Sequence, residues 1–392
     1  MWLYWGLCIL IVVNFAQAQI DKEVLVFGGN GFMGAEAVVM MLEEGYKPVI
    51  VSRGTWRYDA GTRVKPFVKH ISCDRQGPCP DEEPDCNVLS QCKELADYVK
   101  SLKKIDYVVD FSAFDPEVVL DVMELLSGKI GHYIYISTDN VYEVCKFTNK
   151  TVIAETDAVR PDDENLRAEL NSKDNYGDEK LAVEEVLVQQ KKNGGFDWVA
   201  LRLPDVIGPR DNNNRWPILQ MWVKYFHTIN RPLFFPSRFK NLKTSAVFNK
   251  DVARVVLKLL DSDKSVYNEV YNLGFDRAFS PKDIPLYISN ELNIKSLRFD
   301  SNPSNIAFYA YPSVTRGSLD ISKAKEKLGF KPTKWVDALS ETVEFYESQL
   351  PLHEDIYQNV VNVVANQIQD NDARNEFISK TELESKSSGK YI

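Results

Sequence analysis

Residues 24–34 read VLVFGGNGFMG, a short apolar run that leads into evenly spaced glycines. The run Val24 to Phe27 predicts a buried strand, and the apolar periodicity after the turn predicts a helix. Glycines in this position permit a tight turn, let bare backbone approach a pyrophosphate, and aim a helix N-terminus at its negative charge. The stretch therefore predicts a dinucleotide-binding turn at Gly28, Gly31 and Gly34.

Strands and helices alternate along the chain after this turn. The predicted strands are Lys47 to Ser52, Val68 to Ser72, Asp106 to Phe111, Tyr133 to Ser137 and Trp198 to Leu203. Helical patterns cover Ser90 to Leu102, Pro116 to Leu126 and Tyr176 to Lys192. Such alternation predicts an α/β fold, a doubly wound parallel sheet of the Rossmann type, with ligand at the carboxyl ends of the strands.

The chain divides into segments that differ in composition and in the length of their predicted elements. Residues 19–204 are expected to form the dinucleotide-binding unit, with a cysteine-rich insertion at 73–92. Shorter elements rich in aromatic residues and proline predict a smaller substrate lobe over 205–350, which also returns elements to the sheet. Residues 351–392 are polar, so we expect a weak helix followed by a disordered tail.

Composition places the chain among globular proteins of two to three compact units. Its 392 residues are 44% apolar and 26% charged, and 56 acidic against 47 basic residues give a formal net charge of -9. This acidic balance repels phosphate backbones. Nucleic acid is therefore not expected as a partner. The motifs described below lead us to expect a small-molecule substrate instead.

The first eighteen residues, MWLYWGLCILIVVNFAQA, carry no charged side chain. Their apolar core of about twelve residues is shorter than the roughly twenty that a membrane span needs. Ala16 and Ala18 supply the small residues of a cleavage site. We expect a signal peptide over 1–18, with a retained short anchor as the alternative. The mature protein is then secreted or lumenal, in the ER or Golgi, and has no membrane span.

Four cysteines gather in the polar insertion, with spacings unlike the C-x2-C of zinc sites. In an oxidising lumen disulfides are expected, with free thiols as the alternative, and three pairings are open for Cys73, Cys79, Cys86 and Cys92. Asn149-Lys150-Thr151 is a sequon for N-linked glycosylation. The four histidines are scattered along the chain, so a metal site is not expected.

The second predicted strand ends in Ser52-Arg53-Gly54, without the acidic residue that would accept from the ribose 2′-hydroxyl of NAD. An arginine at this place can pair with the 2′-phosphate of NADP. Arg53 therefore favours NADP, with NAD as the second choice and a solvent-facing arginine as the alternative interpretation. Asp74, just past the third strand, is a candidate acceptor for the adenine amino group.

Two Tyr-x3-Lys pairs compete for a catalytic role. Tyr176 and Lys180 open a predicted helix, where this spacing places both side chains on one face, whereas Tyr142 and Lys146 are expected in a loop. A nearby ammonium would lower the pKa of the Tyr176 phenol and make it a usable acid or base. The Thr138 hydroxyl could hold the substrate oxygen in line. An ordinary amphipathic helix with a packed tyrosine is the alternative.

Four motifs in chain order, GGNGFMG, ISTDNVY, YGDEK and LRLPDVIGPRD, resemble the extended short-chain dehydrogenase/reductase family, the NAD(P)-dependent epimerase/dehydratase group. The resemblance runs from about Glu23 to Leu350, and VVDFSAF, GHYIYIS and VSRG are most similar to an atypical bacterial and plastid branch. It implies that Lys180 also binds the nicotinamide ribose. It further implies a catalytic trio of Tyr176, Lys180 and Thr138, and a cofactor turn of Gly28, Gly31, Phe32, Met33 and Gly34.

The sequence departs from the family pattern at three places near the substrate. The Asp-Glu pair of the dehydratases is Asp139-Asn140 here, and an amide cannot serve as the base. Thr244, with Lys243 beside it, stands where epimerases of nucleotide sugars place an arginine that clamps a diphosphate. The asparagine that follows the sixth strand in many relatives is Asp205.

Together these features predict an enzyme that transfers hydride to or from a secondary alcohol or ketone, on a sugar or sugar-like substrate. The alternative is a catalytically silent dinucleotide-binding scaffold, as in plastid relatives that associate with RNA. The family resemblance also implies a homodimer that pairs through the helices Pro116 to Leu126 and Tyr176 to Lys192. The aromatic cluster Trp222, Tyr225 and Phe226 is expected in the core.

Overall fold

The computed structural model describes residues 22–75, 92–301 and 311–388, so the expected signal peptide lies outside these ranges. Seven parallel strands form one sheet in the order β11-β7-β5-β4-β1-β2-β3, which confirms the predicted fold class. The strands are β1 (Glu23–Phe27), β2 (Lys47–Ser52), β3 (Lys69–Ser72), β4 (Ile105–Asp110), β5 (Ile130–Thr138), β7 (Asp197–Leu203) and β11 (Glu269–Asn272).

The strand order reverses beside β1, because β2 and β3 extend the sheet to one side and β4, β5, β7 and β11 extend it to the other. In open parallel sheets ligands bind at such a switch point, outside the carboxyl ends of the strands. The glycine turn that follows β1 therefore lies at the place where a cleft is expected.

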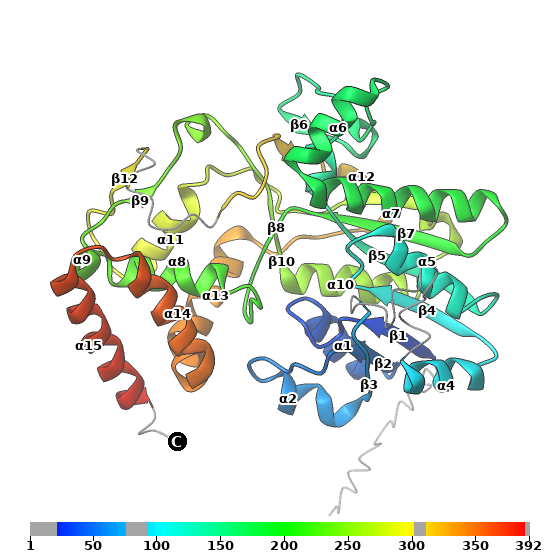
Figure 1. Ribbon diagram of the computed structural model, residues 1–392, viewed down its shortest axis with the longest axis horizontal. Coiled ribbons are helices and arrows are strands. Elements are labelled where there is room, and N and C mark those ends of the chain that lie inside the picture. Colours follow the sequence, from blue (N-terminus) through cyan, green and yellow to red (C-terminus); the bar gives the residue numbers. More distant parts are fainter. Residues whose placement is uncertain (1–21, 76–91, 302–310, 389–392) are drawn as a thin grey trace, which may run out of the picture.

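Side chains of β1 alternate between the two layers of helices that cover the sheet. Val24 and Val26 pack in a cluster with α1 and α10, whereas Leu25 and Phe27 pack in a cluster with α4, α5 and α7. Figure 1 shows these helices around the sheet. Their bounds are α1 (Gly34–Glu43), α4 (Lys93–Ser101), α5 (Pro116–Leu125), α7 (Asn175–Lys192) and α10 (Asn249–Leu259).

A second group of helices, beside the sheet in Figure 1, surrounds a separate core with Trp216 and Trp222 fully buried. Trp222 belongs to this core, Tyr225 packs against it, and Phe226 is buried, as predicted. The helices are α8 (Arg215–Lys224), α9 (Phe226–Ile229), α11 (Asp283–Glu291), α13 (Trp335–Gln349), α14 (Glu354–Gln367) and α15 (Asn371–Ser388).

Short elements complete the described chain. Three two-stranded sheets pair β6 (Val152–Ile153) with β13 (Ser318–Leu319), β8 (Asp205–Ile207) with β10 (Ala246–Phe248), and β9 (Leu233–Phe234) with β12 (Phe299–Asp300). The remaining α-helices are α2 (Ala60–Arg63), α6 (Glu164–Lys173) and α12 (Ser322–Leu328).

The polar C-terminal segment differs from the expected disordered tail. Residues 354–388 form α14 and α15, which pack on the core of the second group of helices, with Val360 and Phe377 fully buried. The Tyr357 hydroxyl donates to the Thr381 carbonyl oxygen at 2.9 Å and joins the two helices. The expectation of a disordered tail is therefore wrong as far as residue 388. None of the helices that the structure describes is long and apolar enough to cross a bilayer.

Candidate active site

A cavity of about 990 Å³ opens at the carboxyl ends of the central strands. Its walls come from the glycine turn, the ends of β2, β3 and β5, the start of α7, and the segment that follows β7. The cavity brings together all the candidate catalytic and cofactor residues predicted from the sequence, namely Gly28, Gly31, Phe32, Met33, Gly34, Arg53, Asp74, Thr138, Tyr176 and Lys180.

The turn after β1 requires bare backbone. Gly28 has a φ of +74°, which side chains rarely allow, and a Cβ at Gly34 would lie 2.3 Å from the carbonyl oxygen of Gly28. Both glycines line the cavity, and α1 begins at Gly34. The turn thus presents backbone and a helix N-terminus to the cavity, which fits the pyrophosphate of a dinucleotide.

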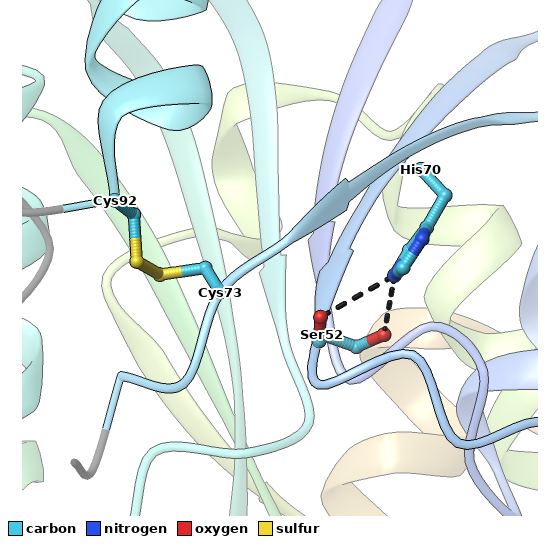
Figure 2. Close-up of a disulfide and its surroundings, with 4 residues drawn as sticks. All are labelled: Ser52, His70, Cys73 and Cys92. Carbon is cyan, nitrogen blue, oxygen red and sulfur yellow. Dashed lines mark hydrogen bonds between the residues drawn. A yellow bond between two sulfur atoms is a disulfide. The ribbon is translucent and has the colours of Figure 1, made fainter.

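The loop after β2 is held by polar contacts on both sides. The Asn30 Nδ2 of the glycine turn donates to the Thr55 carbonyl oxygen at 2.6 Å. Figure 2 shows His70 reaching across from β3, with its Nε2 3.0 Å from the Ser52 Oγ. Arg53 follows Ser52, is exposed, and lines the cavity. Its place therefore suits contact with the ribose of a bound dinucleotide.

A disulfide joins Cys73, directly after β3, to Cys92, directly before α4 (Figure 2). Disulfide formation in the insertion, as predicted, is thus seen for one pair, while Cys79 and Cys86 lie outside the described residues. Cys73 lines the cavity together with the two residues that follow it. Among the described cysteines, Cys145 is a buried free thiol.

The start of α7 is fitted closely against the segment that follows β5. The Asp174 carboxylate caps the helix by accepting from the Gly177 backbone nitrogen at 2.8 Å. A Cβ at Gly177 would lie 2.4 Å from the Asn140 carbonyl oxygen. The Asn140 amide also donates to Asp174 at 2.8 Å. These contacts explain the glycine in YGDEK and fix Tyr176 and Lys180 relative to Thr138.

Lys180 is buried, with 3% of its surface exposed. Its Nζ donates to the carbonyl oxygens of Ala113 at 2.8 Å and Ile136 at 2.6 Å, and lies 4.4 Å from the centre of the Tyr135 ring. Burial lowers the pKa of Lys180 to about 7, although the negative charges of Asp110 and Glu184 oppose this. Lys180 therefore changes its protonation state near neutral pH.

Tyr176 lines the cavity, and its ring lies 6.3 Å from that of Phe114. Desolvation of the phenol raises the pKa of Tyr176 to about 12, although the interaction with the Thr138 side chain lowers it. The sequence predicts that Lys180 lowers this pKa, and the structure gives the opposite direction. Lys180 is not among the groups that act on the Tyr176 phenol, whose pKa follows desolvation, the Thr138 side chain and the charges of Asp139 and Asp174.

Asp139 is a candidate residue that the sequence-based site did not include. It lines the cavity with only 4% of its surface exposed, and its Oδ1 has no hydrogen-bond partner among the described residues. Burial raises the pKa of Asp139 well above its usual range, and the nearby charges of Asp205 and Glu143 act in the same direction. A buried carboxyl group with a raised pKa therefore lines the cavity beside Thr138.

Residues 24–274, well over half of the chain, match the model of the NAD dependent epimerase/dehydratase family. The chain belongs to this family. Its structure resembles UDP-glucose 4-epimerase from Thermotoga maritima, with a TM-score of 0.63 and 19% identity over 84% of this chain and 100% of the other.

Other epimerase/dehydratase family neighbours agree on the fold. The dTDP-glucose 4,6-dehydratase of Bacillus anthracis, solved with NAD, has a TM-score of 0.62 and 18% identity over 87% of this chain and 100% of the other. The chloroplast stem-loop binding protein of 41 kDa b from Arabidopsis thaliana is 24% identical over 67% of this chain. The match spans 61% of the length of that protein.

The substrate end of the cavity shows where this family member departs from the nucleotide-sugar pattern. Asp205 accepts from the Arg215 guanidinium at 2.8 Å and from the Ser313 hydroxyl at 2.7 Å, and these three residues line the cavity. Thr244 is fully buried and does not line this cavity, and Lys243 is exposed. The sequence singled out Asp205 near the substrate, but not its partners: Arg215 is ten residues away and Ser313 is 108 residues away.

The competing Tyr-x3-Lys pair lies away from this cavity. The buried Tyr142 hydroxyl donates to Asn272 at 2.6 Å, and Lys146 pairs at the surface with Asp162. Over 22–75, 92–301 and 311–388, three or more His, Cys, Asp or Glu residues do not gather as a metal site would require.

Proposed function

We propose that the protein is an NAD(P)-dependent oxidoreductase or isomerase that acts by hydride transfer on a secondary alcohol or ketone of a sugar or sugar-like substrate. One observation carries the proposal: the glycine turn and the residues Thr138, Tyr176 and Lys180 line a single cavity. A nicotinamide dinucleotide bound on the turn would supply the hydride acceptor or donor.

Tyr176 is the proposed acid and base. Its raised pKa keeps the phenol protonated at neutral pH, so it can donate a proton to a substrate oxygen that gains electrons. Thr138, whose side chain interacts with Tyr176, orients that oxygen. Lys180 provides an ammonium at or below neutral pH, and this charge favours the phenolate when the reaction runs in the opposite direction.

The residues at the substrate end suit a polyhydroxylated ligand. The neutral Asp139 carboxyl can donate a hydrogen bond as well as accept one, and the Asp205 and Arg215 charges compensate each other. Each hydroxyl group of a sugar ring can donate one hydrogen bond and accept others, so it can pair with donors and with acceptors in the cavity. The support for a sugar substrate is therefore chemical complementarity combined with the family.

NADP is the proposed cofactor, with NAD as the alternative. Arg53 is the basis of this preference, because it is exposed at the mouth of the cavity directly after β2. Asp74 lines the same end and is proposed to accept from the adenine amino group. Gly28, Gly31, Phe32, Met33 and Gly34 would hold the pyrophosphate, and Lys180 the nicotinamide ribose.

Titration of the purified mature protein with NADPH and with NADH tests the proposal. We expect nicotinamide fluorescence to change on binding, with tighter binding of NADPH, and a screen of sugars and nucleotide sugars to yield turnover by the loaded protein. Absence of binding by both nucleotides would refute the proposal. Binding without turnover, across the screen and after mass spectrometry of co-purifying small molecules, would favour the silent scaffold.

We also propose entry into the secretory pathway, with cleavage after Ala18 and a glycan on Asn149, which is exposed in the structure. Production in a secretory host should give an N-terminus at Gln19 and a mass that falls on enzymatic deglycosylation. An uncleaved N-terminus on protein retained in the cytosol would contradict this.

A homodimer through α5 and α7 is proposed in addition. Leu120 on α5 and Val188 on α7 are apolar side chains that the monomer leaves exposed. Light scattering on the purified protein should give twice the monomer mass, and Leu120→Glu should reduce it to the monomer mass. A wild-type monomer at micromolar concentration would overturn the proposal.

A further inference from the structure

The position of Lys180 depends on a turn of backbone that belongs to another part of the fold. One of the two carbonyl groups that accept from its Nζ is that of Ala113, which lies just beyond β4. The segment from Phe111 to Ala113 lies outside strands and helices, so its conformation needs other support. The residue that supplies this support is Asp110, the last residue of β4.

Asp110 is completely buried, and its carboxylate accepts hydrogen bonds from the backbone of this turn. Its Oδ1 accepts from the backbone nitrogens of Ser112 at 2.9 Å and Ala113 at 2.8 Å. Its Oδ2 accepts from the Tyr133 hydroxyl at 2.5 Å. Because the nitrogen of Ala113 is fixed by Asp110, the carbonyl group of the same residue is directed at Lys180.

Arg75 neutralises this buried carboxylate. Its Nη1 lies 2.9 Å from both oxygens of Asp110, its Nη2 donates to the Val118 carbonyl oxygen, and its guanidinium lies 4.3 Å from the centre of the Phe27 ring. The pair therefore compensates the charge of the buried carboxylate and fixes Asp110 beside the turn.

Charge gives Asp110 a second effect on Lys180. Charged groups on several elements act on the pKa of Lys180. The charged form is favoured by Asp110 at the end of β4, Glu184 on α7 and Asp115 before α5. It is disfavoured by Arg75, which follows β3. Asp110 is the largest of these favourable influences. Glu184 is itself paired with Arg202, at 2.6 Å.

We propose that Asp110, paired with Arg75, is the positioning residue for Lys180, and that it acts both through the Ala113 peptide and through its charge. The Arg75–Asp110 pair thus links the β3 end of the cavity to its catalytic end. The inference rests on the proposed function only in taking Lys180 as a cofactor-binding residue.

The test is the protonation midpoint of Lys180 in the variant Asp110→Asn. Acetylation of Lys180 by a small excess of acetic anhydride, measured by mass spectrometry across pH, gives this midpoint without any cofactor. Loss of the carboxylate charge, with Arg75 left uncompensated, should lower the midpoint by about one pH unit or more. Asp251→Asn is the matched control, because Asp251 is equally buried on α10 and does not line the cavity.

A purely structural role predicts the opposite result. Loosening of the turn would hydrate Lys180 and raise its midpoint, so an unchanged or raised midpoint in Asp110→Asn would overturn the proposal. Arg75→Gln provides a second test if Asp110→Asn does not fold. It removes a positive charge near Lys180, so the midpoint should rise, and a fall or no change would contradict the proposal.

A double-mutant cycle on NADPH affinity gives an independent readout. Asp110→Asn should weaken binding about fivefold at pH 7 in the wild-type background, because a fall of about one unit from a pKa of about 7 reduces the charged fraction of Lys180 by about that factor. In the Lys180→Met background, the Asp110→Asn substitution should weaken binding less than twofold, on the order of experimental error. Equal losses in both backgrounds would overturn the proposal. Failure of the wild type to bind NADPH or NADH would instead refute the proposed function and leave the acetylation test intact.

Discussion

The two ends of the cofactor cavity are held in place by different kinds of interaction. At the β3 end, a disulfide, a buried ion pair and the His70–Ser52 contact join segments that are distant in sequence. At the catalytic end, Asp139 has an oxygen without a described partner and the pKa values of Lys180 and Tyr176 are displaced. We call them the rigid end, for the contacts that cross-link it, and the poised end, for its displaced pKa values.

The largest effect should follow from Tyr176→Phe, which tests the poised end. Removal of the hydroxyl should reduce turnover by about a thousandfold, since positioned proton transfer contributes on the order of 10²- to 10⁴-fold. Dinucleotide affinity should stay within about twofold, because the binding groups remain. Turnover is measured by the absorbance of reduced nicotinamide on any substrate found for the wild type.

Tyr142→Phe is the control for this experiment, since Tyr142 begins the other Tyr-x3-Lys pair and lies outside the cavity. We expect a loss of stability in that variant and no loss of turnover. Equal turnover by Tyr176→Phe and wild type would mean that Tyr176 is not the acid and base of the reaction.

The next effect concerns the rigid end. Replacing Cys73 and Cys92 together by serine should lower the free energy of unfolding by about 3 kcal/mol, because the bond closes a loop of 19 residues in the unfolded chain. Guanidinium unfolding measures this loss. Turnover at saturating cofactor should be unchanged, since the disulfide is remote from Tyr176.

Cys145→Ser controls for the loss of a buried sulfur, because Cys145 is a buried free thiol whose Sγ donates to the Val141 carbonyl oxygen. If the double variant lost turnover at saturating cofactor, the disulfide at one end of the cavity would affect the chemistry at the other end, contrary to this expectation.

A smaller effect is expected from Arg53→Gln, which probes cofactor choice at the rigid end. Loss of the guanidinium should weaken NADPH binding about tenfold, which is typical for one charge-assisted contact, and leave NADH binding within about twofold. Fluorescence titration with both nucleotides measures the ratio. Equal losses for both would show that Arg53 contacts a group that the two nucleotides share.

The smallest effect is a change in the pH dependence of stability caused by Asp139. Its folded pKa is raised, so above pH 4 or so the folded state holds a proton that the unfolded state has released, and stability falls as pH rises. Asp139→Asn removes this dependence. The melting temperature of the variant minus that of the wild type should therefore increase by a few degrees as the pH rises from about 5 to about 8.

Asp162→Asn is a suitable comparison, because Asp162 is exposed and Lys146 holds its pKa below the usual value. That variant should run parallel to the wild type over the same pH range. A parallel course for Asp139→Asn as well would show that Asp139 is ionised in the folded protein.

The sheet was predictable because its signals are local. The apolar run before Gly28 and the spacing of glycines identify a strand, a turn and a helix without knowledge of distant residues. The Arg75–Asp110 pair was not predictable, since its members are 35 residues apart and neither side chain carries a local signal. The direction of the Tyr176 pKa was missed for a similar reason, because desolvation depends on packing that the sequence does not display.

The C-terminal helices show a second limit. Residues 351–392 are polar on average, which indicated disorder, yet a few buried positions such as Val360, Val364 and Phe377 suffice to dock two helices. Of the site residues, Thr138, Tyr176 and Lys180 were found through motifs. Asp205, Arg215 and Ser313 meet only in the folded chain.

The docking of α14 and α15 has a consequence for biosynthesis. The core around Trp216 and Trp222 is completed by side chains of α14 and α15, such as Tyr357 and Phe377, which are synthesised after every strand of the sheet. The sheet can assemble while translation continues, whereas the neighbouring helices keep part of their apolar surface exposed until residues 354–388 have been made. Nascent chains arrested before residue 354 should accordingly depend on chaperones, and shortened versions of the protein should aggregate.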